Sequence, residues 1–299
     1  MDVAVMRLLV FGDLHLKPAA DDYDLAAVSP PADVDAALVL GDLTHRAGDD
    51  DAELARRFIG RLAPDVPVVY VPGNHDPAPM PGEVVDTALG ATAEHLSART
   101  LGNLTVVGWG CERRSLAPSL PQTDFDALDP RTAPREDRRH AADRLADDLL
   151  DACHRVVSGA ASTEEVAASL GIADEDAVAF HRGMAEIETT YERLSDRLRR
   201  RSDVLLATHV PPFGTSFDRH HAVGTRETDR EHLHTGSIAL ALAVRDHDVF
   251  AAFSGHSHAF GYDPGDGDGG RPHLLNLGFR GVGVVTVGPA RGEFAFTRW

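Results

Sequence analysis

Cysteines and long apolar runs are scarce in this chain. Only two cysteines, Cys111 and Cys153, occur in 299 residues, which excludes a framework of several disulfides and favours a reducing compartment. No apolar run approaches the roughly 20 residues that a membrane-spanning helix needs. Residues 1–7 are too short and too acidic for a signal peptide. We therefore expect a cytoplasmic protein with no membrane partner.

Lysine is almost absent, and acidic residues outnumber basic ones. Lys17 is the only lysine among 29 basic residues, and 47 acidic residues bring the net charge to −18. An acidic surface that carries arginine in place of lysine suits a halophilic protein, because concentrated salt shortens the reach of its self-repulsion. The alternative explanation is a GC-rich genome, whose codons favour Ala, Arg, Asp and Gly. In either case the field of the molecule disfavours nucleic acid as a partner without excluding it.

Short apolar runs in the first part of the chain end in polar residues of metal-binding types. Runs at 7–11, 38–40 and 68–71 are typical of buried strands, and each is followed by a glycine within two residues. A helix is predicted at 52–62, because its apolar residues recur every three or four positions. Such alternation predicts parallel strands in an α/β fold, with ligands collected at their carboxyl ends. The residues that follow the three runs are Asp13 and His15, then Asp42, then Asn74, His75 and Asp76.

The middle of the chain changes character twice. Residues 113–134 are rich in Pro, Arg and Asp and are predicted to form an irregular loop. Residues 135–201 are predicted to form a helical insertion, in which apolar residues at 180–198 alternate steps of four and three. Ser162 and Glu165 have the spacing of a capping box. We expect the insertion to pack on itself as a helical hairpin, and the alternative is an interface through which two copies form a homo-oligomer.

Two strands near the end of the chain are also followed by histidines. The run at 204–207 leads to His209, and the run at 249–253 leads to His256 and His258. The remaining predicted elements are a helix at 236–247 and strands at 104–107, 274–277, 282–287 and 293–297.

Five predicted strand ends therefore carry side chains that bind metals. Each has an ordinary explanation when taken alone, because Gly-Asp pairs are common in turns and the chain contains 16 histidines. Carboxylates, imidazoles and one amide together suit a divalent transition metal such as Mn, Fe, Zn, Co or Ni. Seven ligands exceed the needs of one tetrahedral ion, and two ions about 3.5–4 Å apart are a general device for displacement at phosphorus. The seven are Asp13, His15, Asp42, Asn74, His209, His256 and His258.

These blocks, in this order, resemble the signature of the calcineurin-like metallophosphoesterase superfamily. They read Gly-Asp-Leu-His, Gly-Asp-Leu-Thr, Gly-Asn-His-Asp, Thr-His and Gly-His-Ser-His, and they span most of the chain apart from the helical insertion. The segment 209–215, together with Thr235-Gly236-Ser237, is similar to a prokaryotic branch grouped with cyclic-nucleotide phosphodiesterases. The resemblance implies a single domain over 1–299 with an α/β fold. That fold is a four-layer αββα sandwich of two mixed β-sheets flanked by helices, with the helical insertion at about 135–201.

The resemblance also implies two divalent metal ions, with manganese expected first. The resemblance implies that the ions would hold a hydroxide as the nucleophile toward phosphorus. His75 is implied as the residue that protonates the leaving oxygen or stabilises developing charge, with Asp76 orienting its ring. The implied ligands are Asp13, His15, Asp42 and His258 for the first ion, and Asp42, Asn74, His209 and His256 for the second.

One segment departs from the superfamily pattern. Related chains often have Asn-Pro-Gly where this chain has Asn276-Leu277-Gly278, so the loop near the phosphate is expected to differ. Arg280 follows this segment and is a candidate contact for substrate phosphate. The alternative is an ordinary surface arginine.

The sequence therefore predicts a dinuclear metal-dependent phosphohydrolase that acts on a small phosphate ester, with a phosphodiesterase as the leading form. One alternative is a nuclease of the same superfamily, which the net charge of −18 opposes. Another is a non-catalytic scaffold, which predicts missing ligands, whereas every ligand of the pattern is present.

Overall fold

The chain folds into two compact units, and each is described by itself. The first comprises Met1–Ser115, Arg200–Val210 and Asp248–Trp299, and the second comprises Leu116–Arg199 and Pro211–His247. The second unit contains most of the predicted helical insertion and extends beyond it on both sides. The computed structural model describes residues 5–17, 29, 31–45, 49–63, 66–76, 97–102, 104–110, 119–199, 201–219, 232–265, 271–288 and 294–298.

A five-stranded mixed sheet forms one half of the first unit. Its strands are β1 (Met6–Gly12), β2 (Ala36–Val39), β3 (Val68–Tyr70), β10 (Gly281–Val287) and β11 (Phe294–Arg298). They lie in the order β11-β10-β1-β2-β3. β1, β2 and β3 run parallel, as the alternation of strand and helix predicts. β10 and β11 extend the sheet on the other side of β1 by antiparallel pairing.

A six-stranded mixed sheet forms the other half. Its strands are β4 (Ser97–Leu101), β5 (Leu104–Trp109), β6 (Val204–Thr208), β7 (Val249–Ser254), β8 (Gly261–Asp263) and β9 (His273–Asn276). They lie in the order β4-β5-β6-β7-β9-β8, with parallel pairing from β5 to β9 and antiparallel pairing at both edges. The sequence did not predict the edge strands β4 and β8. β4 is largely polar and β8 has three residues, so neither has the apolar run that marks a buried strand.

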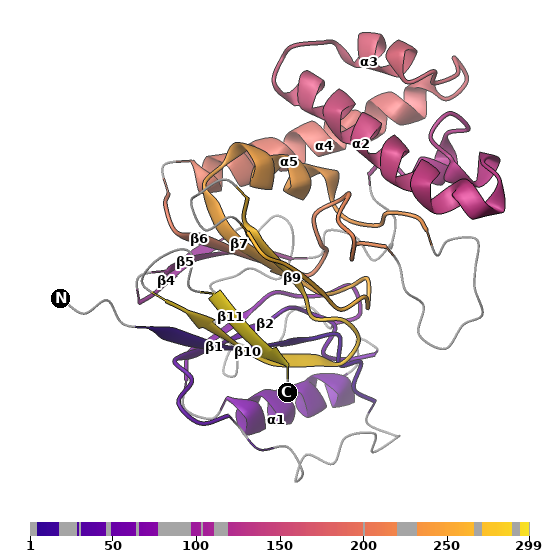
Figure 1. Cartoon of the computed structure of the whole chain (residues 1–299). Helices are drawn as coiled ribbons and strands as arrows, with labels where there is room; N and C mark the ends of the chain where they lie inside the picture. Colours follow the sequence, from indigo (N-terminus) through magenta and orange to yellow (C-terminus); the bar gives the residue numbers. More distant parts are fainter. Residues whose placement is uncertain are drawn as a thin grey trace. The chain divides into compact units, whose positions relative to one another are not determined.

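Apolar side chains from both sheets form the core between them. Because side chains alternate along a strand, Leu8 of β1 faces this core, while Phe11 faces the helix α1 (Asp49–Leu62). The Phe11 ring packs edge-on against Phe58 of α1, with the centroids 6.2 Å apart. Burying each such side chain stabilises the fold by roughly 1.5–3 kcal/mol. The predicted α/β sandwich, with two mixed sheets and a helix outside, is confirmed (Figure 1).

In the part that the structure describes, the second unit contains helices joined by turns and irregular segments. Its helices are α2 (Arg138–Val157), α3 (Thr163–Ser169), α4 (Ala177–Leu198) and α5 (Ile238–Asp246). Ser162 and Glu165 form the predicted capping box at the start of α3. Of the apolar residues spaced along α4, Met184 is buried and its sulfur lies 3.5 Å from the sulfur of Cys153 in α2. α4 therefore packs against α2 within the single chain.

The segment predicted as an irregular loop contains short 3₁₀ turns instead. They are η1 (Gln122–Asp124) and η2 (Pro130–Thr132). A third turn, η3 (Arg135–Asp137), follows this segment and leads directly into α2. The first part of that predicted loop and Cys111 lie outside the described residues. None of the helices in the described part of the chain is long and apolar enough to cross a membrane.

Candidate metal centre

The loops that follow β1 and β2 run side by side and carry three of the predicted ligands. The backbone N–H of Asp13 donates to the Gly41 carbonyl, and that of His15 donates to the Asp42 carbonyl, both at 3.0 Å. Because β1 and β2 are parallel neighbours, their carboxyl ends lie at the same edge of the sheet. The pairing of the two strands thus continues into the loops and brings both carboxylates to one place.

Five predicted ligands have a left-handed backbone, which is uncommon for residues other than glycine. Their φ angles lie between 47° and 68°. Such a conformation costs of the order of 1–3 kcal/mol per residue and persists where the surrounding contacts impose it. Residues of this kind cluster at functional sites. The five are Asp13, His15, Asp42, His256 and His258.

Gly255 allows the backbone after β7 to approach the Asp13 carboxylate. A Cβ atom at Gly255 would lie 2.1 Å from Asp13 Oδ2, which no side chain tolerates. The next residue uses this close approach, because the N–H of His256 donates to both carboxylate oxygens of Asp13 at 3.0 and 2.9 Å. The carboxylate is therefore held in one orientation by a backbone donor from the other sheet.

Gly73 has the same function beside Asp42. A Cβ atom at Gly73 would lie 2.1 Å from Asp42 Oδ1. The same oxygen accepts a hydrogen bond from the backbone N–H of His75 at 2.8 Å. The Pro-Gly break after β3 therefore positions Asp42 as well as the residues that follow it.

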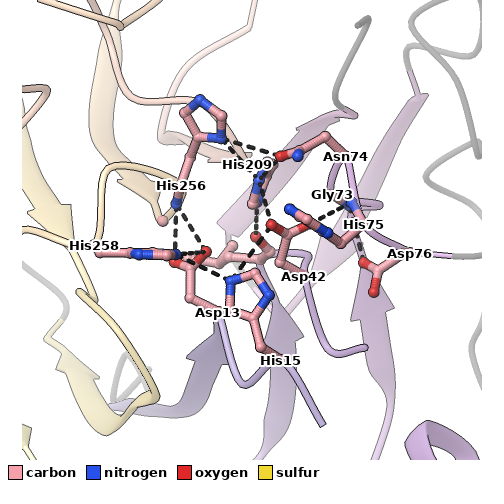
Figure 2. A network of polar contacts seen from close by, with 12 residues as sticks. Asp13, His15, Asp42, Gly73, Asn74, His75, Asp76, His209, His256 and His258 are labelled. Carbon is pink, nitrogen blue, oxygen red and sulfur yellow. Dashed lines mark hydrogen bonds and ion pairs between the residues drawn. The ribbon is translucent and has the colours of Figure 1, made fainter. Parts of the chain in front are cut away.

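Three predicted ligands form a first group at the ends of β1 and β7. The Nε2 atoms of His15 and His258 are 3.0 Å apart, and His258 Nε2 lies 3.8 Å from Asp13 Oδ1. His15 Nε2 also lies 3.7 Å from Oδ2 of Asp42. Figure 2 shows the two imidazoles beside the Asp13 carboxylate. The potential ligand atoms of Asp13, His15 and His258 all lie within 4.8 Å of one another.

A second group forms around His209, at the end of β6. Its Nδ1 donates to the Leu40 carbonyl at 2.8 Å, because a carbonyl only accepts, so in the neutral imidazole Nε2 is the nitrogen with a free lone pair. This Nε2 lies 3.0 Å from Asn74 Oδ1 and 3.5 Å from Asp42 Oδ2. Nδ1 of His256 lies 3.2 Å from both Asn74 Oδ1 and His209 Nε2. The structure therefore brings all seven predicted ligands together, with Asp42 next to both groups (Figure 2).

His75 lies beside these groups, and the residue that holds its ring was not predicted. His75 Nδ1 donates to the backbone carbonyl of His45 at 3.1 Å. The two imidazole rings are nearly parallel, with an interplanar angle of 9° and centroids 5.6 Å apart. The ring of His15 meets that of His75 edge-on at 5.0 Å. A signal for His45 was present in the sequence, since it directly follows the Gly-Asp-Leu-Thr block.

Asp76 has different partners from those predicted. Its Oδ1 accepts from the backbone N–H of Thr44 at 3.1 Å, and its Oδ2 accepts from the Tyr70 hydroxyl at 2.8 Å and from the N–H of Gly73 at 3.0 Å. These contacts correct the prediction that Asp76 orients the His75 ring directly. Asp76 instead fixes the turn after β3, and thereby the backbone that carries Asn74 and His75.

Burial dominates the electrostatics of the site. Burial, opposed by the nearby His209, raises the pKa of Asp13 to about 8. Burial, opposed by the Asp42 carboxylate, lowers the pKa of His15 to about 3. Burial also disfavours the charged form of Asp42, but His209 and His15 outweigh it and hold the pKa of Asp42 below its usual range. The imidazole of His15 is thus neutral, which is the form that binds metals, and Asp13 ionises readily only beside added positive charge.

The donor set fits divalent transition metals. Two buried carboxylates, four imidazoles and one amide oxygen are the oxygen and nitrogen ligands that such ions prefer. Two pairs of ring nitrogens face each other at 3.0 and 3.2 Å, in the manner of ligand atoms around a shared ion. A cation between these groups would offset the cost of burying two carboxylates side by side.

Arg280 lies next to the first group. Its φ angle is 52°, and its backbone N–H donates to the Asp13 carbonyl at 2.9 Å. Its guanidinium carbon lies 5.3 Å from the centroid of the Phe279 ring. The residue that the sequence offered as a phosphate contact is therefore anchored by its backbone to a predicted metal ligand.

Comparison with protein families identifies a family for most of the chain. The family model described as calcineurin-like phosphoesterase matches residues 6–260. This range includes the seven predicted ligands, His75 and Asp76, and it ends before Arg280. No match was found among curated proteins.

The solved structures that are similar to this chain include the following two. Phosphopantetheinyl hydrolase from Mycobacterium tuberculosis matches with a TM-score of 0.50 and 18% sequence identity, over 93% of this chain and 91% of that chain. Vps29 from Chaetomium thermophilum matches with a TM-score of 0.28 and 11% identity, over 98% of this chain and 97% of that chain. The first likeness supports a shared fold, and the second is too distant to support a conclusion.

Proposed function

This chain belongs to the calcineurin-like phosphoesterase family and is a metal-dependent phosphoesterase. We propose that it is a dinuclear phosphodiesterase acting on small phosphate esters. The observation that carries the proposal is the position of Asp42. Its Oδ2 lies 3.7 Å from His15 Nε2 and 3.5 Å from His209 Nε2, so one buried carboxylate adjoins both donor groups. The preference for a diester is supported by the likeness of segment 209–215 to the phosphodiesterase branch of the superfamily.

Each proposed ion has oxygen and nitrogen ligands. When bound, the pair supplies Lewis-acid polarisation of the phosphate and lowers the pKa of water enough for attack on phosphorus near neutral pH. Manganese is the proposed metal, and Fe, Zn, Co and Ni share its preference for these donors. One ion would be held by Asp13, His15, Asp42 and His258, and the other by Asp42, Asn74, His209 and His256.

His75 is assigned the transfer of a proton to the leaving oxygen. Its Nδ1 is committed to the His45 carbonyl, so Nε2 is the nitrogen that exchanges a proton with substrate. Stacking against the His45 ring restricts rotation of the His75 imidazole. Arg280 is assigned to the phosphate itself, since a guanidinium binds phosphate oxygens through charged hydrogen bonds.

Metal removal and return test the proposal directly. The purified protein is treated with chelator, dialysed and given Mn²⁺, and hydrolysis of bis-p-nitrophenyl phosphate is compared with that of p-nitrophenyl phosphate. We expect activity to disappear with the metal, to return with Mn²⁺, and to show a higher kcat/KM for the diester. Full activity in excess chelator would exclude the metal mechanism, and a preference for the monoester would exclude the diesterase assignment. Single-stranded DNA in the same panel tests the nuclease alternative, which predicts that it is the best substrate.

A second experiment distinguishes the proposed role of His75 from that of a metal ligand. Replacing His75 with Ala is expected to lower turnover by about 10²–10⁴-fold, because general acid catalysis contributes that much. Both ions should remain bound, as measured by metal analysis, since the ring is not assigned as a ligand. Loss of an ion in this variant would show that His75 holds metal. The exposed His140 of α2, replaced in the same way, is the matched control and should leave turnover unchanged.

A further inference from the structure

The loop between β9 and β10 is fastened to the segments that carry the first group of ligands. The backbone N–H of Phe279 donates to the carbonyl of His258 at 3.3 Å, and that of Arg280 donates to the carbonyl of Asp13 at 2.9 Å. Gly278 permits this path, because its φ is +70° and a Cβ there would lie 2.8 Å from the backbone nitrogen of Phe260. The position of Phe279 is therefore imposed by the backbone on both sides of it.

The buried side chain of Asn276 forms hydrogen bonds that hold the same loop in place. Its side chain is fully buried, and its Nδ2 donates to the Gly255 carbonyl at 2.6 Å and to Ser257 Oγ at 3.0 Å. Its Oδ1 accepts from the N–H of Gly278 at 2.9 Å. Asn276 thus joins the loop of Phe279 to the Gly-His-Ser-His loop by hydrogen bonds.

The ring of Phe279 packs on two of the predicted metal ligands. It is stacked on the imidazole of His15, with centroids 5.9 Å apart and an interplanar angle of 25°, and it meets the imidazole of His258 at 5.2 Å and 59°. Among the described residues, its other ring partner is the guanidinium of Arg280. Both imidazoles belong to the group with Asp13, while His209 and His256 pack on each other at 5.0 Å. The aromatic contact therefore reaches only one of the two donor groups.

We propose that Phe279 is a positioning residue that selectively strengthens metal binding by the Asp13, His15 and His258 group. A phenyl ring has no atom that coordinates a metal, so its effect is on the ligands. It limits rotation of two imidazoles and covers them from water, and contacts outside the ligand shell control affinity in this way. The inference rests on the proposed assignment of ligands to two ions, and it adds that the two sites differ in their support.

Calorimetric titration of Mn²⁺ into metal-free protein tests this without measuring activity. The wild-type chain should show two sites. In Phe279→Leu, which keeps apolar volume but loses the ring faces, one site should weaken by about 10–100-fold, the usual effect of losing a contact behind a ligand. Phe279→Tyr keeps the ring and should retain both affinities. Phe260→Leu is the matched control, because Phe260 is 46% exposed and its ring contacts Phe296 and Arg298 instead.

Ligand variants identify which site has weakened. His209→Ala removes a ligand of the second group, so the remaining Mn²⁺ binding is that of the first group. Adding Phe279→Leu to this variant should weaken that binding. His15→Ala leaves the second group intact, so adding Phe279→Leu should change nothing further. Equal weakening in both backgrounds, or none in either, would overturn the inference. If Phe279→Leu does not fold, Phe279→Met replaces it in the same comparison.

Different results would contradict the proposed function and the inference on Phe279. A wild-type chain that binds fewer than two ions would contradict the dinuclear assignment, whatever the variants do. Two sites in the wild type with unchanged titration in Phe279→Leu would contradict only the inference on Phe279.

Discussion

Among single residues, Asp42 is constrained in four ways. It is almost fully buried, has a left-handed backbone, accepts from the N–H of His75 and lies near imidazoles of both donor groups. Burying a carboxylate is costly unless charge or hydrogen bonds compensate. The surroundings of Asp42 supply both, which is why its pKa stays low while that of Asp13 rises.

Replacing Asp42 with Asn should therefore weaken both ions together. The amide keeps the shape of the side chain but lacks the negative charge that both proposed sites share. We expect metal analysis to show loss of both ions at limiting Mn²⁺, and phosphoesterase activity to fall by about a thousand-fold or more, since the ions supply several kcal/mol of transition-state stabilisation. Two ions retained at full occupancy would exclude Asp42 as the bridge. Asp33→Asn is the control, because Asp33 also has a positive φ but is exposed in a turn before β2.

The predictions made from the sequence about single residues also contained errors, and these have a common cause. Asp76 was predicted to contact His75, its neighbour in the chain, but its carboxylate contacts Tyr70 and Thr44. His45 and Phe279 were not predicted to belong to the site. The contacts of Asp76 with Thr44, of His45 with His75 and of Phe279 with His15 join residues on different loops. They therefore depend on how the strands pair and on where the chain turns.

At the element scale, the close approach of loops is what assembles the site. β1, β2 and β3 belong to one sheet and β6 and β7 to the other, and each presents its ligands at its carboxyl end. Apolar runs in the sequence predicted these strands, and their alternation with helices predicted parallel pairing. Because ligands collect where parallel strands end, the site was expected at these ends. β4 and β8 escaped prediction because edge strands are short or polar.

A methyl group added at Gly255 should disrupt this assembly. In Gly255→Ala the new Cβ would lie 2.1 Å from Asp13 Oδ2, so the carboxylate or the Gly-His-Ser-His loop must shift. We expect metal affinity and activity to fall sharply, as measured by titration and by hydrolysis of the diester. Gly60→Ala is the contrasting control, because a Cβ atom at Gly60, within α1, would meet no other atom within 4 Å. That change should raise stability by roughly 0.5–1 kcal/mol in thermal unfolding. Normal metal binding in Gly255→Ala would mean that the contact is not required.

At the scale of the whole molecule, the net charge of −18 governs the response to salt. The range of electrostatic repulsion shortens from about 8 Å at 0.15 M salt to about 3 Å at 1 M. A chain with one lysine and 47 acidic residues should therefore gain stability as salt is added.

Thermal unfolding in increasing KCl tests this expectation. The unfolding temperature of the metal-free protein should rise between 0.1 and about 2 M KCl, because screening removes self-repulsion in the folded state. The metal-free form is used so that binding at the site does not contribute. A falling unfolding temperature over this range would favour codon composition as the origin of the acidic surface.

The amino-acid sequence alone was enough to predict the α/β fold, the candidate metal ligands and, through the resemblance of its motifs to a superfamily, the class of reaction. These depend on local patterns, because apolar runs specify strands and the residue after a strand lies at a sheet edge wherever that strand pairs. The three-dimensional structure was needed to establish which side chains face each other. In the structure, Asp42 lies next to both donor groups. His75 donates a hydrogen bond to the carbonyl of His45. The ring of Phe279 packs against His15 and His258. Contacts of this kind join residues up to 264 positions apart, from His15 to Phe279, and the pairing of two sheets is what brings them within reach.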